Sequence, residues 1–320
     1  MEQKRFDVVA LGELLIDFTE NGLSGQGNLL FEANPGGAPC NVLAMLKKLG
    51  RSCAFVGKVG EDMFGHLLRD VAEEADICMD YLIFDKDVRT TLAFVKTFPN
   101  GDRDFSFYRN PGADMMLKEE ELKTDMLSEC EIFHFGTLSM THDEVRRATK
   151  KAIALAKENG ALISFDPNLR PPLWSSLDLA KEQVAYGLGQ CDVLKISDNE
   201  IQWFTGKEDY DEGIAVLQET YHIPLILLSL GKEGSRAYYK GLRVEKAPYL
   251  QENTIETTGA GDTFGGSCLH FVLKYGLDNL DEEKLLEMLS FANGAASLIT
   301  TRKGALKVMP EVDEVKKLIQ

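Results

Sequence analysis

The most informative stretch of this sequence is Glu256-Thr257-Thr258-Gly259-Ala260-Gly261-Asp262, which runs directly into the apolar, helix-like segment 263–269. Gly259 and Gly261 lack a Cβ atom, so the backbone there can approach a ligand closely. The first N–H groups of a helix have no acceptor within the helix and lie at the positive end of its dipole. The pattern therefore predicts an anion hole suited to a phosphate, with Asp262 beside it as a proton acceptor. A glycine-rich turn with an acidic helix-start residue explains these seven residues alone equally well.

The composition is that of an ordinary globular protein. The chain has 320 residues, of which 44% are hydrophobic and 27% are charged, and a chain of this length buries roughly 75% of its unfolded surface. The formal net charge of −16 argues against nucleic acid or an anionic membrane as a partner. The six cysteines are scattered without a CxxC pair, and the N-terminus has no apolar signal segment. We therefore expect a cytoplasmic protein.

Short apolar runs alternate with segments of helical period along most of the chain. The runs predict buried strands, and the segments between them predict amphipathic helices. This alternation predicts an α/β fold with a mainly parallel sheet covered by helices on both faces. The predicted strands are Val8–Leu11, Cys53–Val56, Ile132–Phe135, Leu162–Phe165, Val193–Ile196 and Leu225–Leu230, and the predicted helices are Val42–Leu49, Asp62–Ala75, Asp143–Asn159 and Leu285–Thr300.

Two segments, at about residues 12–34 and 89–109, break this pattern because their polar and apolar residues alternate. Alternation predicts antiparallel strands that project from the main sheet, and Pro99-Asn100-Gly101-Asp102 is a strong hairpin turn signal. A small β lid over the active site is the functional interpretation. A structural extension or a dimer surface is the alternative, and both can hold together.

A second glycine-containing constellation, Asn34-Pro35-Gly36-Gly37-Ala38-Pro39-Cys40-Asn41, opens the predicted helix Val42–Leu49. Paired glycines let a ligand lie against the backbone, and Asn41 offers a donor and an acceptor together, which suits hydroxyl groups. Glycines between a loop and a helix are frequent, so this stretch is a weak signal alone. Its combination with the 256–262 stretch, about 220 residues downstream, is specific.

The pair resembles the two signatures of the ribokinase-like (PfkB) sugar kinase family, and the resemblance covers nearly the whole chain. It implies a three-layer ribokinase-like fold in a single domain over residues 1–320, with the small β lid within it. It also implies transfer of the ATP γ-phosphate to a sugar hydroxyl. Further family-like stretches are Gly12-Glu13-Leu14-Leu15-Ile16-Asp17, 57–65 and 301–305, and a likeness to the fructokinases rests on Gly36-Gly37-Ala38-Pro39, Phe107-Tyr108-Arg109 with Ala113-Asp114, and Asp166-Pro167-Asn168-Leu169-Arg170.

The resemblance implies a role for individual residues around the sugar. Asp262 would be the catalytic base, and the N–H groups of Gly259, Ala260 and Gly261 would form the anion hole. A structural salt bridge is the alternative for Arg170, although it follows a predicted strand end, where ligands bind in open α/β sheets. The implied sugar-side residues are Asp17, Gly36, Gly37, Asn41, Arg109 and Arg170.

The resemblance likewise implies ATP and Mg²⁺ as cofactors, while a P-loop motif is absent from the sequence. Glu200 matches a glutamate that organises Mg²⁺ through water, although Ser197 stands where the family has asparagine. A helix-start acid is the competing interpretation of Glu200. Glu256 and Thr258 match a site for a monovalent cation, K⁺. The implied nucleotide-side residues are Lys195, Ser229, Gly231, Gly234 and Asn293, the last of which could instead be a satisfied core residue.

The resemblance favours phosphorylation of D-fructose at its 6-hydroxyl, and three alternatives remain open. A 2-keto-3-deoxygluconate kinase of the same family would also use residues like Arg109 and Arg170, because an acid sugar needs cations. A non-catalytic sugar- or nucleotide-binding regulator is a different class, but it would be expected to lack Asp262 or the glycines. A nucleoside kinase shares the scaffold without the fructokinase-like stretches. A homodimer through the β lid is a further expectation.

Overall fold

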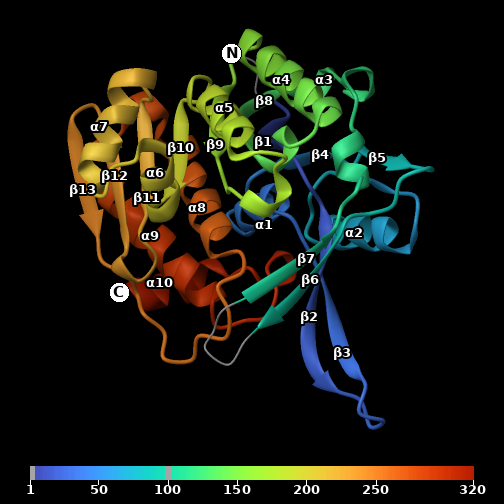
Figure 1. Cartoon of the computed structure of the whole chain (residues 1–320). Coiled ribbons are helices and arrows are strands. Elements are labelled where there is room, and N and C mark those ends of the chain that lie inside the picture. The colour runs from blue at the N-terminus through green and yellow to red at the C-terminus, as the bar shows by residue number, and fades with distance from the viewer. Residues whose placement is uncertain (1–3, 98–102) are drawn as a thin grey trace.

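The main sheet contains nine strands in the order β13-β12-β11-β10-β9-β8-β1-β4-β5, in a computed structural model that describes residues 4–97 and 103–320 (Figure 1). All six predicted strands are present, and each pairs parallel with the predicted strands beside it. This confirms the predicted mainly parallel sheet. The bounds are β1 Phe6–Leu11, β4 Cys53–Gly60, β5 Leu82–Asp85, β8 Cys130–Gly136, β9 Leu162–Asp166, β10 Val193–Ser197, β11 Leu225–Ser229, β12 Ser235–Tyr239 and β13 Leu242–Lys246.

The edge strands β5 and β13, and β12 next to β13, have no counterpart among the predicted strands. β12 pairs antiparallel with β11, and β13 pairs antiparallel with β12. β13 buries only its central residue, Val244, deeply. It therefore lacks the continuous apolar run that identifies a strand buried on both faces.

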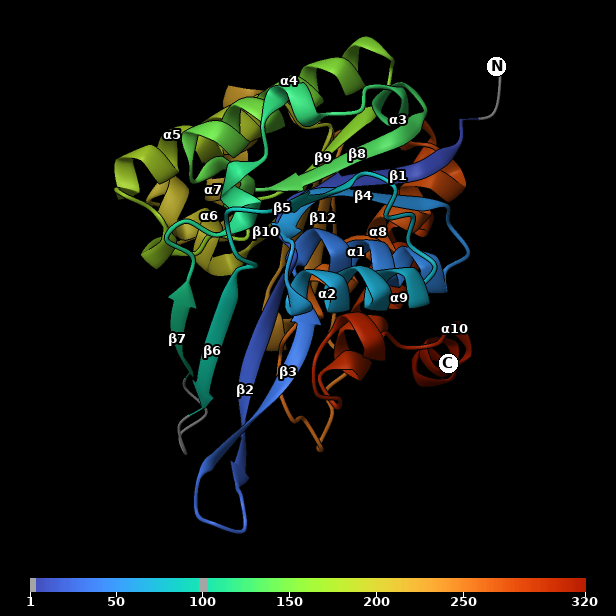
Figure 2. The same cartoon turned by 90° about the vertical axis from the view of Figure 1, so that its right-hand side faces the viewer.

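Helices cover both faces of the main sheet, as Figure 2 shows. One face carries α1, α2, α8 and α9, with α10 packed against α9, and the other carries α3 to α7. All four predicted helices are confirmed, with ends that differ by a few residues. The bounds are α1 Ala38–Lys48, α2 Met63–Glu74, α3 Asp125–Ser128, α4 Asp143–Glu158, α5 Leu177–Leu188, α6 Asp198–Thr205, α7 Tyr210–Tyr221, α8 Ala260–Tyr275, α9 Glu282–Ile299 and α10 Val312–Ile319.

The alternating segments form a separate four-stranded sheet in the order β3-β2-β6-β7, which we call the lid sheet. Its bounds are β2 Leu15–Leu23, β3 Leu29–Gly36, β6 Leu92–Thr97 and β7 Arg103–Tyr108; the turn expected at 99–102 lies outside the described residues. The expectation that all its strands are antiparallel is wrong, because β2 pairs parallel with β6. Both of these strands leave the body of the molecule in the same direction, so the two hairpins meet along strands of equal sense.

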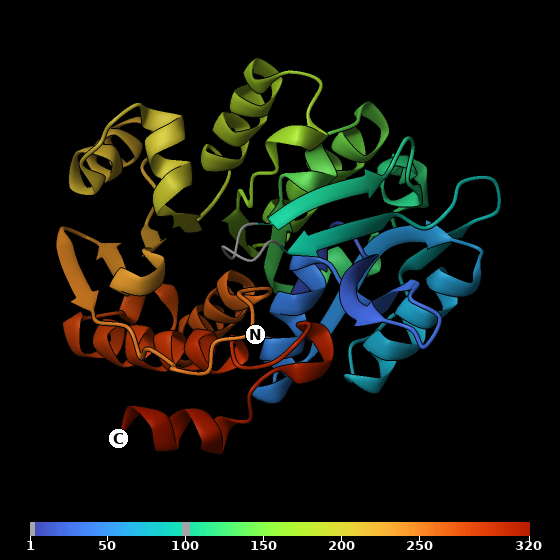
Figure 3. The same cartoon turned by 60° about the horizontal axis from the view of Figure 1, so that its bottom comes forward.

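The functional end of the molecule lies where the carboxyl ends of the parallel strands meet the lid sheet. Figure 3 shows the lid strands on one side and the β12–β13 edge on the other. Ligands of open α/β sheets bind outside the carboxyl ends of the strands. None of the described helices combines the length and the apolar character that crossing a bilayer requires.

Candidate active site

The predicted anion hole lies at the start of α8. Gly259 is the N-cap residue with φ 74°, and it supplies no side-chain cap. A Cβ atom on Gly259 would lie 2.6 Å from the Cβ of Ala305, so both the backbone conformation and the packing require glycine. The N–H of Ala260 donates to Thr257 O at 3.3 Å, while the N–H groups of Gly261 and Asp262 lack acceptors within the helix and remain suited to an anion.

Asp262 lies in the first turn of α8 and is held by Asn41 of α1. Asn41 Nδ2 donates to Asp262 Oδ2 at 2.8 Å, and the two residues are only 4% and 8% exposed. Burial raises the pKa of Asp262, while the Asn41 hydrogen bond and the cations of Lys195 and Arg170 act in the opposite direction. Asn41 Oδ1 is buried without a hydrogen-bond partner among the described residues, so it remains available to a ligand hydroxyl.

Lys195 brings a positive charge to the anion hole from the neighbouring strand β10. Its Nζ lies 2.9 Å from Asp166 Oδ2 at the end of β9, and a Cβ atom on Gly261 would lie 3.1 Å from the same Nζ. Burial alone would lower the pKa of Lys195, but the carboxylates of Asp166 and Glu200 outweigh it and raise the pKa. Burial raises the pKa of Asp166 to about 7 although Lys195 opposes the rise. The lysine is therefore charged at neutral pH.

Two cavities meet at the anion hole, and both are lined by Thr257 and Gly261. The smaller one, the sugar-side cavity, has a volume of about 270 Å³ and is mainly polar. The larger one, the nucleotide-side cavity, has a volume of about 480 Å³ and is mainly apolar. Asp262 lines the sugar-side cavity, so an acceptor bound there would lie between the carboxylate and the anion hole.

Most of the predicted residues line one of the two cavities. Lys195 lines the sugar-side cavity and not the nucleotide-side cavity to which it is assigned by resemblance. The lid sheet contributes Leu15, Asp17, Val95 and Phe107 to the sugar-side cavity. The sugar-side cavity contains Asp17, Gly37, Asn41, Arg170, Lys195, Glu256, Thr258, Gly259, Gly261 and Asp262, and the nucleotide-side cavity contains Ser229, Gly231, Gly234, Ala260, Gly261 and Asn293.

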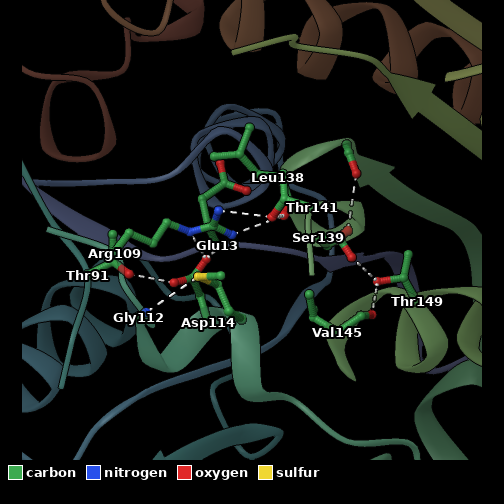
Figure 4. A network of polar contacts seen from close by, with 12 residues as sticks. Glu13, Thr91, Arg109, Gly112, Asp114, Leu138, Ser139, Thr141, Val145 and Thr149 are labelled. Atoms are coloured by element: carbon green, nitrogen blue, oxygen red, sulfur yellow. Dashed lines mark hydrogen bonds and ion pairs between the residues drawn. The ribbon is translucent and has the colours of Figure 1, made fainter. Parts of the chain in front are cut away.

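Arg109 lies outside the lining of both cavities, in a buried polar network that Figure 4 shows. Its Nε and Nη2 contact Asp114 Oδ2 at 2.8 and 2.7 Å, Nη1 donates to Thr141 Oγ1 at 2.9 Å, and Nη2 donates to Leu138 O at 3.0 Å. The side chains of Arg109 and Asp114 are each 2% exposed, and Asp114 Oδ1 accepts from Thr91 Oγ1. The network joins the roots of β6 and β7 to the loop after β8. The guanidinium of Arg109 therefore binds protein groups and does not line the sugar-side cavity, which differs from the expected sugar-side position.

Gly36 and Glu200 also lie outside the two linings. Glu200 Oε1 accepts from Leu169 N at 2.8 Å, and Oε2 accepts from Ser197 N and Oγ at 2.9 and 2.8 Å. Glu200 thus forms the capping box at the start of α6, which is the competing interpretation of this residue. Its remaining lone pairs and its charge beside Lys195 still allow contact with water molecules of a metal ion.

The residues expected near K⁺ are organised by backbone contacts. Glu256 Oε1 accepts from Gly304 N at 2.7 Å, and the N–H groups of Ile255 and Glu256 donate to Thr300 O at 2.8 and 3.2 Å. The loop before α8 is thereby tied to the turn after α9. The described residues contain no group of three or more His, Cys, Asp or Glu side chains arranged to hold a metal ion.

Asn293 lines the nucleotide-side cavity, but its amide is occupied by the protein. Its Oδ1 accepts from Ser235 Oγ at 2.8 Å, and its Nδ2 donates to the carbonyl oxygens of Lys246 and Ala247, each at 3.1 Å. It joins α9 to β12, to the last residue of β13 and to the residue after it. The structure therefore places it as a satisfied residue of the cavity wall.

Glu13 is a cavity residue for which neither the sequence pattern nor the family resemblance predicts a role. It follows β1 and is 5% exposed, and burial raises its pKa to about 7. Only its position within Gly12–Asp17 pointed to it. Its neighbours in space, such as Ala38, are distant in the sequence.

Comparisons with known proteins identify the family of this chain. The model of the pfkB family carbohydrate kinases matches residues 5–312. A probable fructokinase-4 of Arabidopsis thaliana and fructokinase-2 of Solanum habrochaites are each 39% identical over 315 residues, covering 98% of this chain and 96% of the relative.

Solved structures extend the likeness to three dimensions. A fructokinase with bound ATP from Xylella fastidiosa has a TM-score of 0.89 at 31% identity and covers 98% of both chains. A fructokinase from Vibrio cholerae O395 in a fructose-, ADP- and calcium-bound form has a TM-score of 0.87 at 29% identity, covering 99% of this chain and 100% of that chain. The chain therefore belongs to the pfkB family of carbohydrate kinases and has the ribokinase-like fold.

Proposed function

We propose that this protein is an ATP-dependent fructokinase that transfers the γ-phosphate of ATP to the 6-hydroxyl of D-fructose. The observation that carries the proposal is the position of Asp262, a buried carboxylate that lines the polar cavity and follows Gly261, which lines both cavities. Relatives named as fructokinases cover nearly the full chain at about 40% identity. ADP and fructose 6-phosphate are the products.

The proposed role of Asp262 is to accept the proton of the attacking hydroxyl as the new O–P bond forms. The hydrogen bond from Asn41 keeps one carboxylate oxygen in place and leaves the other for the substrate. Lys195 and the N–H groups at the start of α8 stabilise the charge on the transferred phosphoryl group, while the ADP oxygen leaves on the opposite side. Phosphoryl transfer depends mainly on such positioning and charge stabilisation.

The cation inventory supports a neutral ketose over 2-keto-3-deoxygluconate once Arg170 is assigned to the transferred phosphate. An acid sugar needs an uncompensated cation for its carboxylate. Arg109 is neutralised by Asp114, and Lys195 is paired with Asp166. Of the described cations in the sugar-side cavity, this leaves Arg170, whose Nη1 donates only to the carbonyl oxygens of Asn168 and Leu169. We assign Arg170 to the transferred phosphate.

Mg²⁺ and K⁺ belong to the proposal as cofactors. The donors at the start of α8, together with Lys195 and Glu200, fit a nucleotide whose Mg²⁺ keeps most of its water molecules. Bound Mg²⁺ would neutralise charge on the phosphates. Glu256 and the nearby carbonyl groups offer oxygen atoms of the kind K⁺ prefers, and a related fructokinase of Vibrio cholerae is described in a potassium-bound form.

The lid sheet has a proposed second role as the contact between two copies of the chain. Its outer part exposes the apolar side chains Leu23, Leu29, Leu30 and Phe31. Clustered apolar residues of this kind mark interaction surfaces. Sedimentation that finds only monomers at micromolar concentration would remove this part of the proposal.

The test of the proposed function is ADP release with Mg-ATP across fructose, glucose, ribose, adenosine and 2-keto-3-deoxygluconate. We expect turnover that is selective for fructose and that falls by about 10²–10⁴ in kcat in Asp262→Asn, because a positioned general base contributes that much. Asp209→Asn, at the exposed start of α7, is the matched control and should keep full activity. Turnover selective for the acid sugar would move the substrate assignment, and full activity of Asp262→Asn would refute the assigned base.

A further inference from the structure

Glu13 is a buried carboxyl group of the sugar-side cavity that the proposed mechanism does not use. It lies in the turn that leads from the end of β1 to the start of β2. Burying a carboxyl group is costly unless a specific contact compensates for it. The contacts of Glu13 therefore indicate what the residue does.

The carboxylate of Glu13 caps helix α1 from a distant part of the chain. Its Oε1 accepts from the N–H of Ala38, the first residue of α1, at 2.8 Å. Helix α1 has no cap of its own, since the N-cap residue is Gly37 and no acidic residue lies in the first turn. Glu13 thus supplies the acceptor that a Ser, Asp or Asn at the N-cap usually provides.

Steric contacts fix the same turn against the same helix start. A Cβ atom on Gly37 would overlap the carbonyl oxygen of Glu13, and a Cβ atom on Gly12 would lie 2.5 Å from Cγ of Pro39. The turn and the helix start can approach this closely only because both positions are glycine. These contacts do not involve the Glu13 carboxylate and support the coupling independently.

One turn along α1, Asn41 donates its hydrogen bond to Asp262. We propose that Glu13 is a positioning residue for the catalytic base, because it fixes the first turn of α1 and thereby holds Asn41 against Asp262. This inference rests on the proposed function, in which Asp262 is the base. The contact with Ala38 needs an acceptor oxygen at Glu13 and not a full negative charge.

The surroundings of Glu13 agree with a role that needs no charge. Burial raises its pKa to about 7, although hydrogen bonds from the N–H groups of Glu13 and Ala38 lower it. The nearby charge of Asp114 raises the pKa further, and that of Arg109 lowers it. At neutral pH the side chain is thus partly protonated. A carbonyl oxygen at the same place can accept the Ala38 hydrogen bond, so Glu13→Gln preserves the contact and Glu13→Ala removes it.

The experiment compares Glu13→Gln, Glu13→Ala, Asn41→Ala and the double variant Glu13→Ala/Asn41→Ala in fructose turnover. We expect Glu13→Gln to keep kcat and Glu13→Ala to lose about 10- to 100-fold in kcat, as expected for a misplaced reacting group. The double variant should be no slower than Asn41→Ala, because both changes act through the same hydrogen bond. Asp209→Ala, which removes the cap of α7 away from the site, controls for a general loss of helix capping.

The pH profile gives a readout that a loss of stability alone would not move. The Asn41 hydrogen bond lowers the pKa of Asp262, so loosening it should shift the acid limb of kcat/KM to higher pH. The shift should occur in Glu13→Ala and Asn41→Ala and be absent from Glu13→Gln. Hydrogen exchange of the Cys40 and Asn41 amides, measured in the intact protein, should accelerate in Glu13→Ala and stay unchanged in Glu13→Gln.

Three results would overturn the inference. A raised KM for fructose with unchanged kcat in Glu13→Ala would identify a direct sugar contact. Additive losses in the double variant would show that Glu13 does not act through Asn41. Unchanged kcat in Glu13→Ala with accelerated amide exchange would show that the helix start does not control the base. Absence of turnover in the unmodified protein is a different outcome, because it refutes the proposed function and leaves the exchange measurement to test the contact.

Discussion

Replacement of Arg109 by methionine should destabilise the protein strongly while leaving sugar binding nearly unchanged. The change leaves Asp114, whose side chain is 2% exposed, as a buried carboxylate without its cation. Breaking a buried ion pair from one side costs about 3–5 kcal/mol. The free energy of unfolding of a typical domain is about 5–15 kcal/mol, so the loss is a large share of the total.

Urea unfolding followed by tryptophan fluorescence, with fructose KM measured in parallel at low temperature, checks this prediction. Arg147→Met is the matched control, since Arg147 pairs with Glu144 at the surface and should cost at most about 1 kcal/mol. Arg109→Met/Asp114→Leu should recover much of the loss, because no uncompensated charge remains. The KM for fructose should stay within about threefold in all variants, because Arg109 is absent from the cavity lining.

The opposite pattern would contradict a purely structural role for Arg109. A loss of less than about 1 kcal/mol in the free energy of unfolding of Arg109→Met, together with a tenfold or larger increase in the KM for fructose, would identify Arg109 as a substrate-binding residue. The ion pair with Asp114 would then have to open when the sugar binds. A 2-keto-3-deoxygluconate kinase would become the better proposal, since the freed guanidinium could hold its carboxylate.

Three further predictions concern backbone strain, pH and the monovalent cation. Gly37→Ala, at φ 144° with its Cβ overlapping the Glu13 carbonyl oxygen, should lower the free energy of unfolding by about 1–3 kcal/mol and raise the KM for fructose, whereas Gly50→Ala, with open space around it, should leave KM unchanged. The free energy of unfolding should fall as pH rises from about 4.5 to about 7, because burial raises the pKa of Glu13 to about 7 and the folded state keeps a proton that the unfolded state has released; urea midpoints in Glu13→Gln should show a smaller slope, and an equal slope would contradict this. Replacement of K⁺ by tetramethylammonium should lower kcat, and Glu256→Gln, which weakens the contact to Gly304, should reduce the response to K⁺; equal turnover with both cations would exclude the cation site.

The sequence predicts the central sheet well because the relevant signals are local. Strands buried on both faces need continuous apolar runs, and covering helices need an apolar stripe, so the order of elements can be derived from periodicity. The anion hole is local as well, since Gly259, Gly261 and the start of α8 lie within a few residues. The edge strand β13 is missed because a strand with one covered side lacks such a run.

The direction of pairing in the lid sheet could not be derived in the same way. Alternation identifies each strand, and a turn identifies each hairpin, but neither says which strands of two hairpins meet. β2 and β6 pair parallel because both leave the body in the same sense, which depends on where β1 and β5 lie in the main sheet.

The amino-acid sequence by itself determined the α/β order, the glycine-rich helix start and, through resemblance, the identity of Asp262 as the expected base. Only the tertiary structure decided which polar groups those residues meet. Asn41 and Asp262 are 221 positions apart in the chain, yet they share a hydrogen bond of 2.8 Å. Arg109 is the opposite case. An arginine in a sugar-kinase pattern suggests a ligand contact, but the N–H groups of Arg109 donate to Asp114 and to the carbonyl oxygen of Leu138. The physical reason is the same in both: burial makes the energy of a charge depend on its neighbours in space, and those neighbours are set by the packing of distant segments.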